Sequence, residues 1–95
     1  MKREEIGEIF SATFKSSFIL EIHSTDFDIP LFGKIIGCTE GNWRTANENK
    51  WRVVELENIV KYVSSEEKDL TKIICGDNLT EIVLILNGRR YKYGK

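Results

Sequence analysis

The pair Asn87-Gly88 constrains the fold of this chain more than any other feature of the sequence. It separates residues 79–86, the most β-prone segment, from a second alternating run at residues 89–93. Both central positions of a type I′ turn need positive φ, which Asn and Gly tolerate, so the pair predicts a two-residue β-hairpin. A turn of this length also fixes the register of the two strands. The predicted cross-strand pairs are Leu84 with Tyr91, Ile82 with Tyr93, Ile85 with Arg90, and Val83 with Lys92.

The two faces of this hairpin differ in composition. One face is apolar, whereas the other combines Val83 and Ile85 with Arg90 and Lys92, whose aliphatic stems can cover apolar neighbours while their charges reach water. Apolar residues on both faces of residues 79–86 indicate that this strand is central in its sheet, or that its outer face meets another subunit. We expect a homo-oligomer that forms through Val83 and Ile85.

The first segment of the chain has an amphipathic pattern. Its apolar residues recur at intervals of three and four positions, and charged residues fill most positions between them. This spacing predicts a helix over about residues 3–14 that packs its apolar side on a sheet or on one end of a barrel. The apolar residues are Ile6, Ile9, Phe10 and Phe14.

Residues 18–23 alternate between two faces and predict the first strand. The residues expected to face the core are Phe18, Leu20 and Ile22, and those expected to point the other way are Ile19, Glu21 and His23. His23 is the only histidine in the chain. On the outer face of a strand, such a side chain is more often solvated or hydrogen-bonded than catalytic.

The central part of the chain, residues 32–63, predicts two strands joined by a polar loop. Gly33, Gly37 and Gly41 lie in the first half, at positions where a curved sheet bends. The second strand begins at Trp51, and the apolar residues after it have helical spacing, which predicts one short turn that caps a barrel end. Those residues are Leu56, Ile59, Val60 and Val63.

The order of these segments predicts an α+β fold in a single domain over residues 1–95. One amphipathic helix is followed by five or six strands, which is typical of a mostly antiparallel small barrel or a strongly bent sheet. The segments FGKIIGCTEG (residues 32–41) and WRVVELENIVKYV (residues 51–63) resemble strands of Sm-like and SH3-like small barrels, including the WYL-type ligand-binding domains of bacterial regulators. The resemblance covers about half of the chain and implies a barrel. No binding residues carry over, because the sequence lacks the Trp-Tyr-Leu triplet of the WYL family and the Asp and Asn residues by which Sm proteins bind uridine.

Composition and charge narrow the range of functions. The net charge is −1 and the pI is about 5.8, so binding to nucleic acid or to an anionic membrane needs a local patch. No apolar run approaches the roughly 18 residues that span a membrane, and the acidic start does not fit a signal peptide, so we expect a cytoplasmic protein. Cys38 and Cys75 are the only cysteines, and we expect both to be reduced, half-buried strand residues.

The sequence does not predict an enzyme. It contains no nucleophile elbow, no phosphate-binding glycine loop and no cluster of Cys and His at metal-ligand spacing. We therefore expect no catalytic residue, no metal and no cofactor.

Trp43 lies in residues 39–50, an almost entirely polar segment that we expect to be a loop. One interpretation is that Trp43 folds back as a lid over the barrel. The other is that it is a contact residue, because an exposed Trp beside Arg is typical of binding hot spots and of stacking platforms for bases. Arg44 follows it directly, and Trp51-Arg52 repeats the pairing, so a hairpin would bring the two pairs together.

Two functional hypotheses are compatible with these features. The first is a non-enzymatic protein-interaction or inhibitor module, of the kind that phages and other mobile elements encode, which uses the Trp43 loop and the face with Val83 and Ile85. The second is a module that binds nucleic acid or a small phosphorylated ligand, and salt would weaken that complex far more steeply. Its cationic and aromatic patch would consist of Trp43, Arg44, Trp51, Arg52, Arg89, Arg90, Tyr91 and Lys92.

Overall fold

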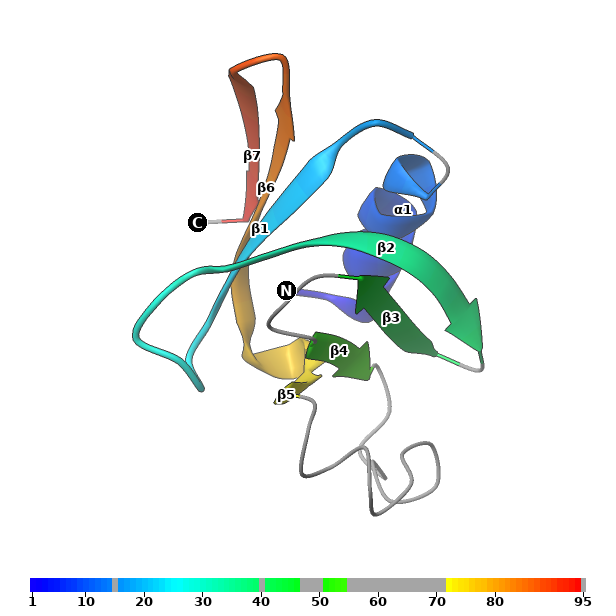
Figure 1. The fold of residues 1–95 in the computed structure, drawn as a ribbon. Coiled ribbons are helices and arrows are strands. Elements are labelled where there is room, and N and C mark those ends of the chain that lie inside the picture. The colour runs from blue at the N-terminus through cyan, green and yellow to red at the C-terminus, as the bar shows by residue number, and fades with distance from the viewer. Residues whose placement is uncertain (15, 40, 47–50, 55–71, 95) are drawn as a thin grey trace.

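The computed structural model describes residues 1–14, 16–39, 41–46, 51–54 and 72–94. One helix comes first, and strands make up most of the remainder (Figure 1). The elements are α1 (Arg3–Thr13), β1 (Ile19–Ser24), β2 (Leu31–Thr39), β3 (Asn42–Ala46), β4 (Trp51–Val54), β5 (Lys72–Cys75), the short 3-10 helix η2 (Gly76–Asn78), β6 (Leu79–Leu86) and β7 (Arg89–Gly94). The closing turn predicted around Leu56, Ile59, Val60 and Val63 lies outside the described residues.

The seven described strands form one sheet in the order β5-β4-β3-β2-β1-β6-β7. Neighbouring strands are antiparallel, except that β4 and β5 are parallel. This architecture confirms the α+β class. The predicted barrel is not confirmed, because β5 and β7 lie at opposite ends of an open sheet. The described strands number seven, against the five or six predicted.

Strand β3 is the strand that the sequence pattern did not predict. The polar residues 42–46 pair with β2 on one side and with β4 on the other. Gly41, with a φ of 78°, lies between β2 and β3, where a left-handed backbone permits a tight turn. A polar sequence can form this strand because ladders on both sides satisfy its backbone groups.

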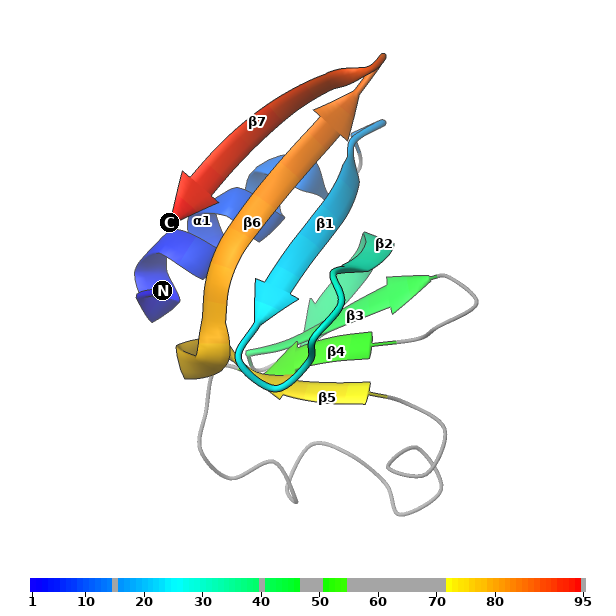
Figure 2. The ribbon, with the colours of Figure 1, turned by 90° about the vertical axis from the view of Figure 1, so that its left-hand side faces the viewer.

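Strand β2 is shared by two parts of the sheet that run in different directions. Residues 31–33 pair with β1, whereas residues 34–39 pair with β3. A bulge between Ile35 and Gly37 interrupts the second ladder, and bulges bend the strand in which they occur. Figure 2 shows the result, with β3, β4 and β5 crossing the direction of β1, β6 and β7.

Helix α1 covers the inner side of this bend. It confirms the helix predicted over residues 3–14, and its residues Ile6 and Phe10 are fully buried. The ring of Phe10 meets that of Trp43 edge to face, with centroids 5.5 Å apart. The same core cluster contains residues of both parts of the sheet, so one helix packs against both. The sheet residues of the cluster include Leu20, Ile22, Leu31, Ile35, Trp43, Val53, Ile74, Leu79, Ile82 and Leu84.

The hairpin of β6 and β7 has the predicted turn and the predicted register. Asn87 and Gly88 have φ values of 52° and 79°, as a type I′ turn requires. All four predicted cross-strand pairs are present. Strand β6 lies between β1 and β7, which is the central position that its apolar residues on both faces indicated.

Two further expectations concern the cysteines and the membrane. Neither cysteine is in a disulfide, and Cys75 is half-buried on β5 as predicted. Cys38 is exposed near the end of β2, so the expectation of half-burial was wrong for this residue. Within the ranges that the structure describes, no helix is long and apolar enough to cross a membrane.

We predict that Gly88→Val destabilises the protein by about 1–3 kcal/mol, because it forces a β-branched residue to positive φ. A Cβ at this position would meet no other atom within 4 Å, so the cost is conformational. Gly88→Asn is the matched control, since Asn tolerates this region and should cost much less. Urea unfolding measures the difference, and equal midpoints for Val and Gly would contradict the turn.

We also predict that Trp43→Ala costs roughly 3 kcal/mol or more, because removing a large buried aromatic side chain leaves a cavity beside Phe10. Trp43→Phe keeps a ring at this position and should cost less. Thermal and urea unfolding of both variants provide the measurement. An unshifted midpoint for Trp43→Ala would show that the indole does not belong to the core.

Candidate protein interface

Of the two tryptophans in the predicted site, the structure describes the side chain of Trp43 but not that of Trp51. Trp43 is only 7% exposed and belongs to the core, so it is not a surface contact residue as the second interpretation required. The physical reason is strand β3, which turns this side chain toward α1 instead of leaving it in a loop. Trp51 pairs with Lys72 through the backbone of β4 and β5, and its side chain lies outside the described part of the structure.

Arg44 and Arg52 are brought together, as the sequence predicted for a hairpin. They are direct cross-strand partners in β3 and β4, which places both side chains on the same face of the sheet. Arg44 is exposed, and its Nη2 lies 2.9 Å from the position that a Cβ on Gly37 would occupy. The absence of a side chain at Gly37 therefore leaves room for the Arg44 guanidinium over β2.

The other predicted site residues, Arg89, Arg90, Tyr91 and Lys92, all lie on β7 and are exposed. Four strands separate β7 from β4 in the sheet order. The predicted cationic and aromatic patch is therefore two separate groups, one on β3 and β4 and the other on β7.

Glu21 is the centre of a polar network on the outer face of the sheet, the face opposite α1. It is only 5% exposed, although it points away from the core. Its Oε2 accepts a hydrogen bond from Nη2 of Arg90 at 2.8 Å and lies 2.8 Å from Nε2 of His23. The network ties β7 to β1 across the intervening strand β6.

Hydrogen bonding sets the charge state of Glu21. The hydrogen bond from Arg90 is the largest influence on its pKa, followed by burial, which acts in the opposite direction, and by the bond to His23. The net effect lowers the pKa of Glu21 below its ordinary value of 4.5. The carboxylate is therefore ionised at neutral pH, and Arg90 offsets its charge.

Three large apolar side chains are exposed on the same outer face. Ile19 is 49% exposed on β1, and Phe32 and Ile36 are 47% and 52% exposed on β2. Phe32 pairs directly with Glu21, so Ile19 is its diagonal neighbour on the same face. We call these three residues the outer patch. The alternation of residues 18–23 had placed Ile19 on this face, but no pattern singled out Phe32 or Ile36.

The outer patch does not include the residues predicted to contact a second copy of the chain. Val83 is fully buried, and Ile85 is partly buried opposite Ile19. Val83 lies directly between Glu21 on β1 and Lys92 on β7 in the register of the sheet. Val83 therefore offers almost no surface to a second copy, and the predicted contact between copies stays a prediction.

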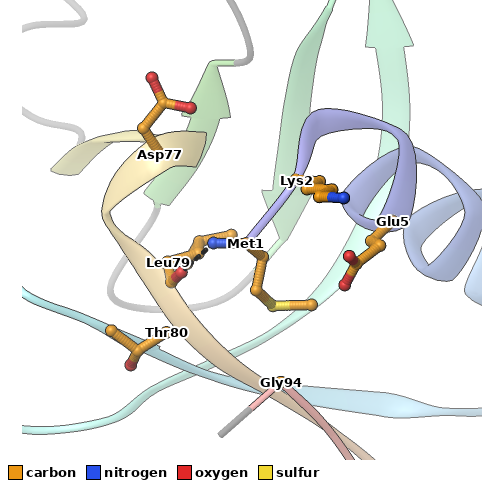
Figure 3. A pocket seen from close by; sticks show the side chains of 7 residues that line it. All are labelled: Met1, Lys2, Glu5, Asp77, Leu79, Thr80 and Gly94. Carbon is orange, nitrogen blue, oxygen red and sulfur yellow. Dashed lines mark hydrogen bonds between the residues drawn. The ribbon is translucent and has the colours of Figure 1, made fainter.

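A separate open pocket of about 490 Å³ lies where the start of α1 meets η2 and the ends of β6 and β7 (Figure 3). The N-terminal amine donates a hydrogen bond to the carbonyl oxygen of Leu79 at 2.6 Å across it. The pocket is lined by Met1, Lys2, Glu5, Asp77, Leu79, Thr80 and Gly94. Its charged side chains have both signs and do not converge on one point, so we assign no ligand to it. Nowhere in the described ranges are three His, Cys, Asp or Glu residues grouped to hold a metal ion.

Comparison with known proteins adds no assignment to this geometry. No family model matches the chain, and neither the curated proteins nor the solved structures include a significant match.

We predict that Glu21→Gln lowers the free energy of unfolding at pH 7 by about 1–3 kcal/mol, because it removes a charge-assisted hydrogen bond at a buried position. The folded-state pKa of Glu21 is lowered, so its stabilisation is complete above pH 4.5 and is lost as the pH falls through the folded value. The difference between wild type and variant should therefore shrink on acidification.

Urea unfolding at pH 7 and at several lower pH values measures this effect. Glu81→Gln makes the same chemical change on the same face, opposite His23, and is the matched control. A Glu21→Gln difference that stays constant from pH 7 into the acid range would contradict the role of the ionised carboxylate.

Proposed function

We propose that this chain is a non-enzymatic module that binds a partner protein through the outer face of β1 and β2. The observation that carries the proposal is the outer patch, in which Ile19, Phe32 and Ile36 are each about half exposed on one face. Apolar side chains that gather on one face with charged residues around them are typical of protein contact surfaces. The core does not require these three side chains, because it forms on the opposite face against α1.

The charged residues around the outer patch indicate the chemistry of the partner. Lys34 is exposed between Phe32 and Ile36 on β2, and Arg44 is exposed on the neighbouring strand β3. The Glu21 carboxylate on this face is offset by Arg90. The face is therefore locally cationic although the chain has a net charge of −1. A partner with an apolar centre and acidic residues around it would complement this surface.

The surroundings of His23 favour binding over catalysis. The imidazole is engaged with Glu21, which is itself held by Arg90. These residues lie on a sheet face, and the pocket of Figure 3 is lined by other residues. A general base would be expected to face a substrate-sized cavity.

One observation favours a second candidate function, the binding of a phosphorylated ligand or of nucleic acid. Arg44 and Arg52 are direct cross-strand partners, which places two guanidinium-bearing side chains on one face of the sheet. Arginine also suits phosphate recognition, because its planar guanidinium donates two parallel hydrogen bonds.

The proposed function is tested by capture and titration. The tagged chain is used to capture proteins from a lysate of its native host, and the purified partner is then titrated by calorimetry at low and moderate salt. We expect the double variant Ile19→Thr/Ile36→Thr to weaken binding at least about tenfold, because it removes exposed apolar area and keeps β-branched side chains. Ile29→Thr is the matched control, since Ile29 is 62% exposed but lies outside the strands.

Two results would contradict the proposal. One is equal affinity of the double variant, the Ile29→Thr control and the wild type. The other is binding to an oligonucleotide that weakens steeply with salt and is lost in Arg44→Ala/Arg52→Ala, which would establish the second candidate instead.

A further inference from the structure

Strand β7 is an edge of the sheet, and the described part of the chain places no strand beside it (Figure 2). All six of its residues are exposed. An exposed edge presents backbone N–H and C=O groups that can pair with an additional strand. The edge is therefore a surface with a defined geometry, distinct from the outer patch.

The hairpin register determines which backbone groups face outward. In a two-residue hairpin the residues that flank the turn form a hydrogen-bonded pair, and such pairs recur at every second position. Leu86 pairs with Arg89, so Arg89, Tyr91 and Tyr93 direct their backbone groups toward β6. The N–H and C=O groups of Arg90 and Lys92 are directed away from β6, toward an incoming strand.

The side chains of β7 specify what that strand should carry. Arg90 and Lys92 lie on the outer face, where they pair with Ile85 and Val83. Tyr91 and Tyr93 lie on the other face and are 42% and 43% exposed. Two of these side chains are already held in place, because Arg90 bonds to Glu21 and Tyr91 packs edge to face on Phe18 with centroids 6.2 Å apart.

The same cations oppose pairing of this edge with a second copy of itself. An antiparallel β7–β7 contact with the outer faces aligned would place Arg90 and Lys92 opposite the same cations of the other copy. Like charges directly opposite each other destabilise a strand pair, and Lys on an edge strand is a common protection against self-association. An acidic strand would instead find complementary charge.

We propose that β7 binds an extended segment of a partner protein in which acidic residues alternate with apolar ones. The acidic residues lie opposite Arg90 and Lys92 on the outer face, and the apolar residues contact Tyr91 and Tyr93 on the other. Backbone pairing provides the affinity, and the side-chain alternation provides the specificity. This inference rests on the proposed function, since it names a recognition mode for a protein partner.

The test uses synthetic peptides of alternating Glu and Val as the probe. One matched peptide carries N-methyl groups that remove its pairing N–H groups but keeps the charge, and another replaces Glu with Lys. NMR titration of the full chain should show the largest shifts at the amides of Arg90 and Lys92. Both control peptides should bind at least about tenfold more weakly than the Glu-Val peptide.

Two variants separate backbone pairing from charge. Lys92→Ala removes the charge and keeps the N–H, and it should weaken peptide binding about two- to fivefold. Lys92→Pro also removes the outward N–H without removing a hydrogen bond to β6, because Pro is compatible with such edge positions, and it should abolish binding. The NMR spectrum of each variant verifies that the β6–β7 hairpin is intact.

Several results would overturn the inference. Equal binding of the N-methylated peptide would show that charge alone acts, and peptide-induced shifts confined to other elements would place the contact elsewhere. A dimer that Lys92→Pro dissociates would show that a second copy occupies the edge. If Lys92→Pro leaves the affinity for the captured partner unchanged while Ile19→Thr/Ile36→Thr reduces it, the strand-addition inference fails and the proposed function stands.

Discussion

The fold depends on the packing of one short helix against a sheet that bends. Phe10 contacts the ring of Trp43 on β3, and the core cluster also contains Leu20 and Ile82 from the other part of the sheet. A chain of 95 residues has only a modest core, so one helix must cover both parts. The bulge in β2 makes this possible, because it turns one continuous sheet around α1. Without the bend, β3, β4 and β5 would leave their apolar side chains in water.

Helix α1 packs on one side of the sheet, and among the described residues the polar groups on the opposite side are stabilised by side chains of the sheet itself. Glu21 illustrates the requirement, because a buried carboxylate is costly unless charged or polar groups compensate it. Arg90 provides that compensation from two strands away. The arrangement fastens the edge strand β7 to β1, and it leaves the exposed apolar residues of β1 and β2 in a locally cationic setting.

Local signals in the sequence predicted the parts of the fold that local chemistry determines. Asn87-Gly88 fixed a turn and its register, and the spacing of Ile6 and Phe10 located the helix. The parts that depend on distant neighbours were not predictable in this way. The polar residues of β3 form a strand only because β2 and β4 flank them, and the closure of a barrel depends on how far the sheet bends.

The same distinction between local and distant determinants applies to the residues of the candidate site. The sequence brought Arg44 and Arg52 together and placed Arg90 and Lys92 on the outer face of the hairpin, where the structure has them. It did not predict the burial of Val83 or the exposure of Phe32 and Ile36, since the exposure of a strand residue depends on its neighbours in the folded sheet.

The position of β1 between β2 and β6 affects the kinetics of folding. Residues 19–24 complete their ladders only with residues 79–85, so this strand acquires its second neighbour only after about 60 further residues have been synthesised. Such non-local pairing slows folding, and the β6–β7 hairpin, whose contacts are local, is well suited to form early and to receive β1.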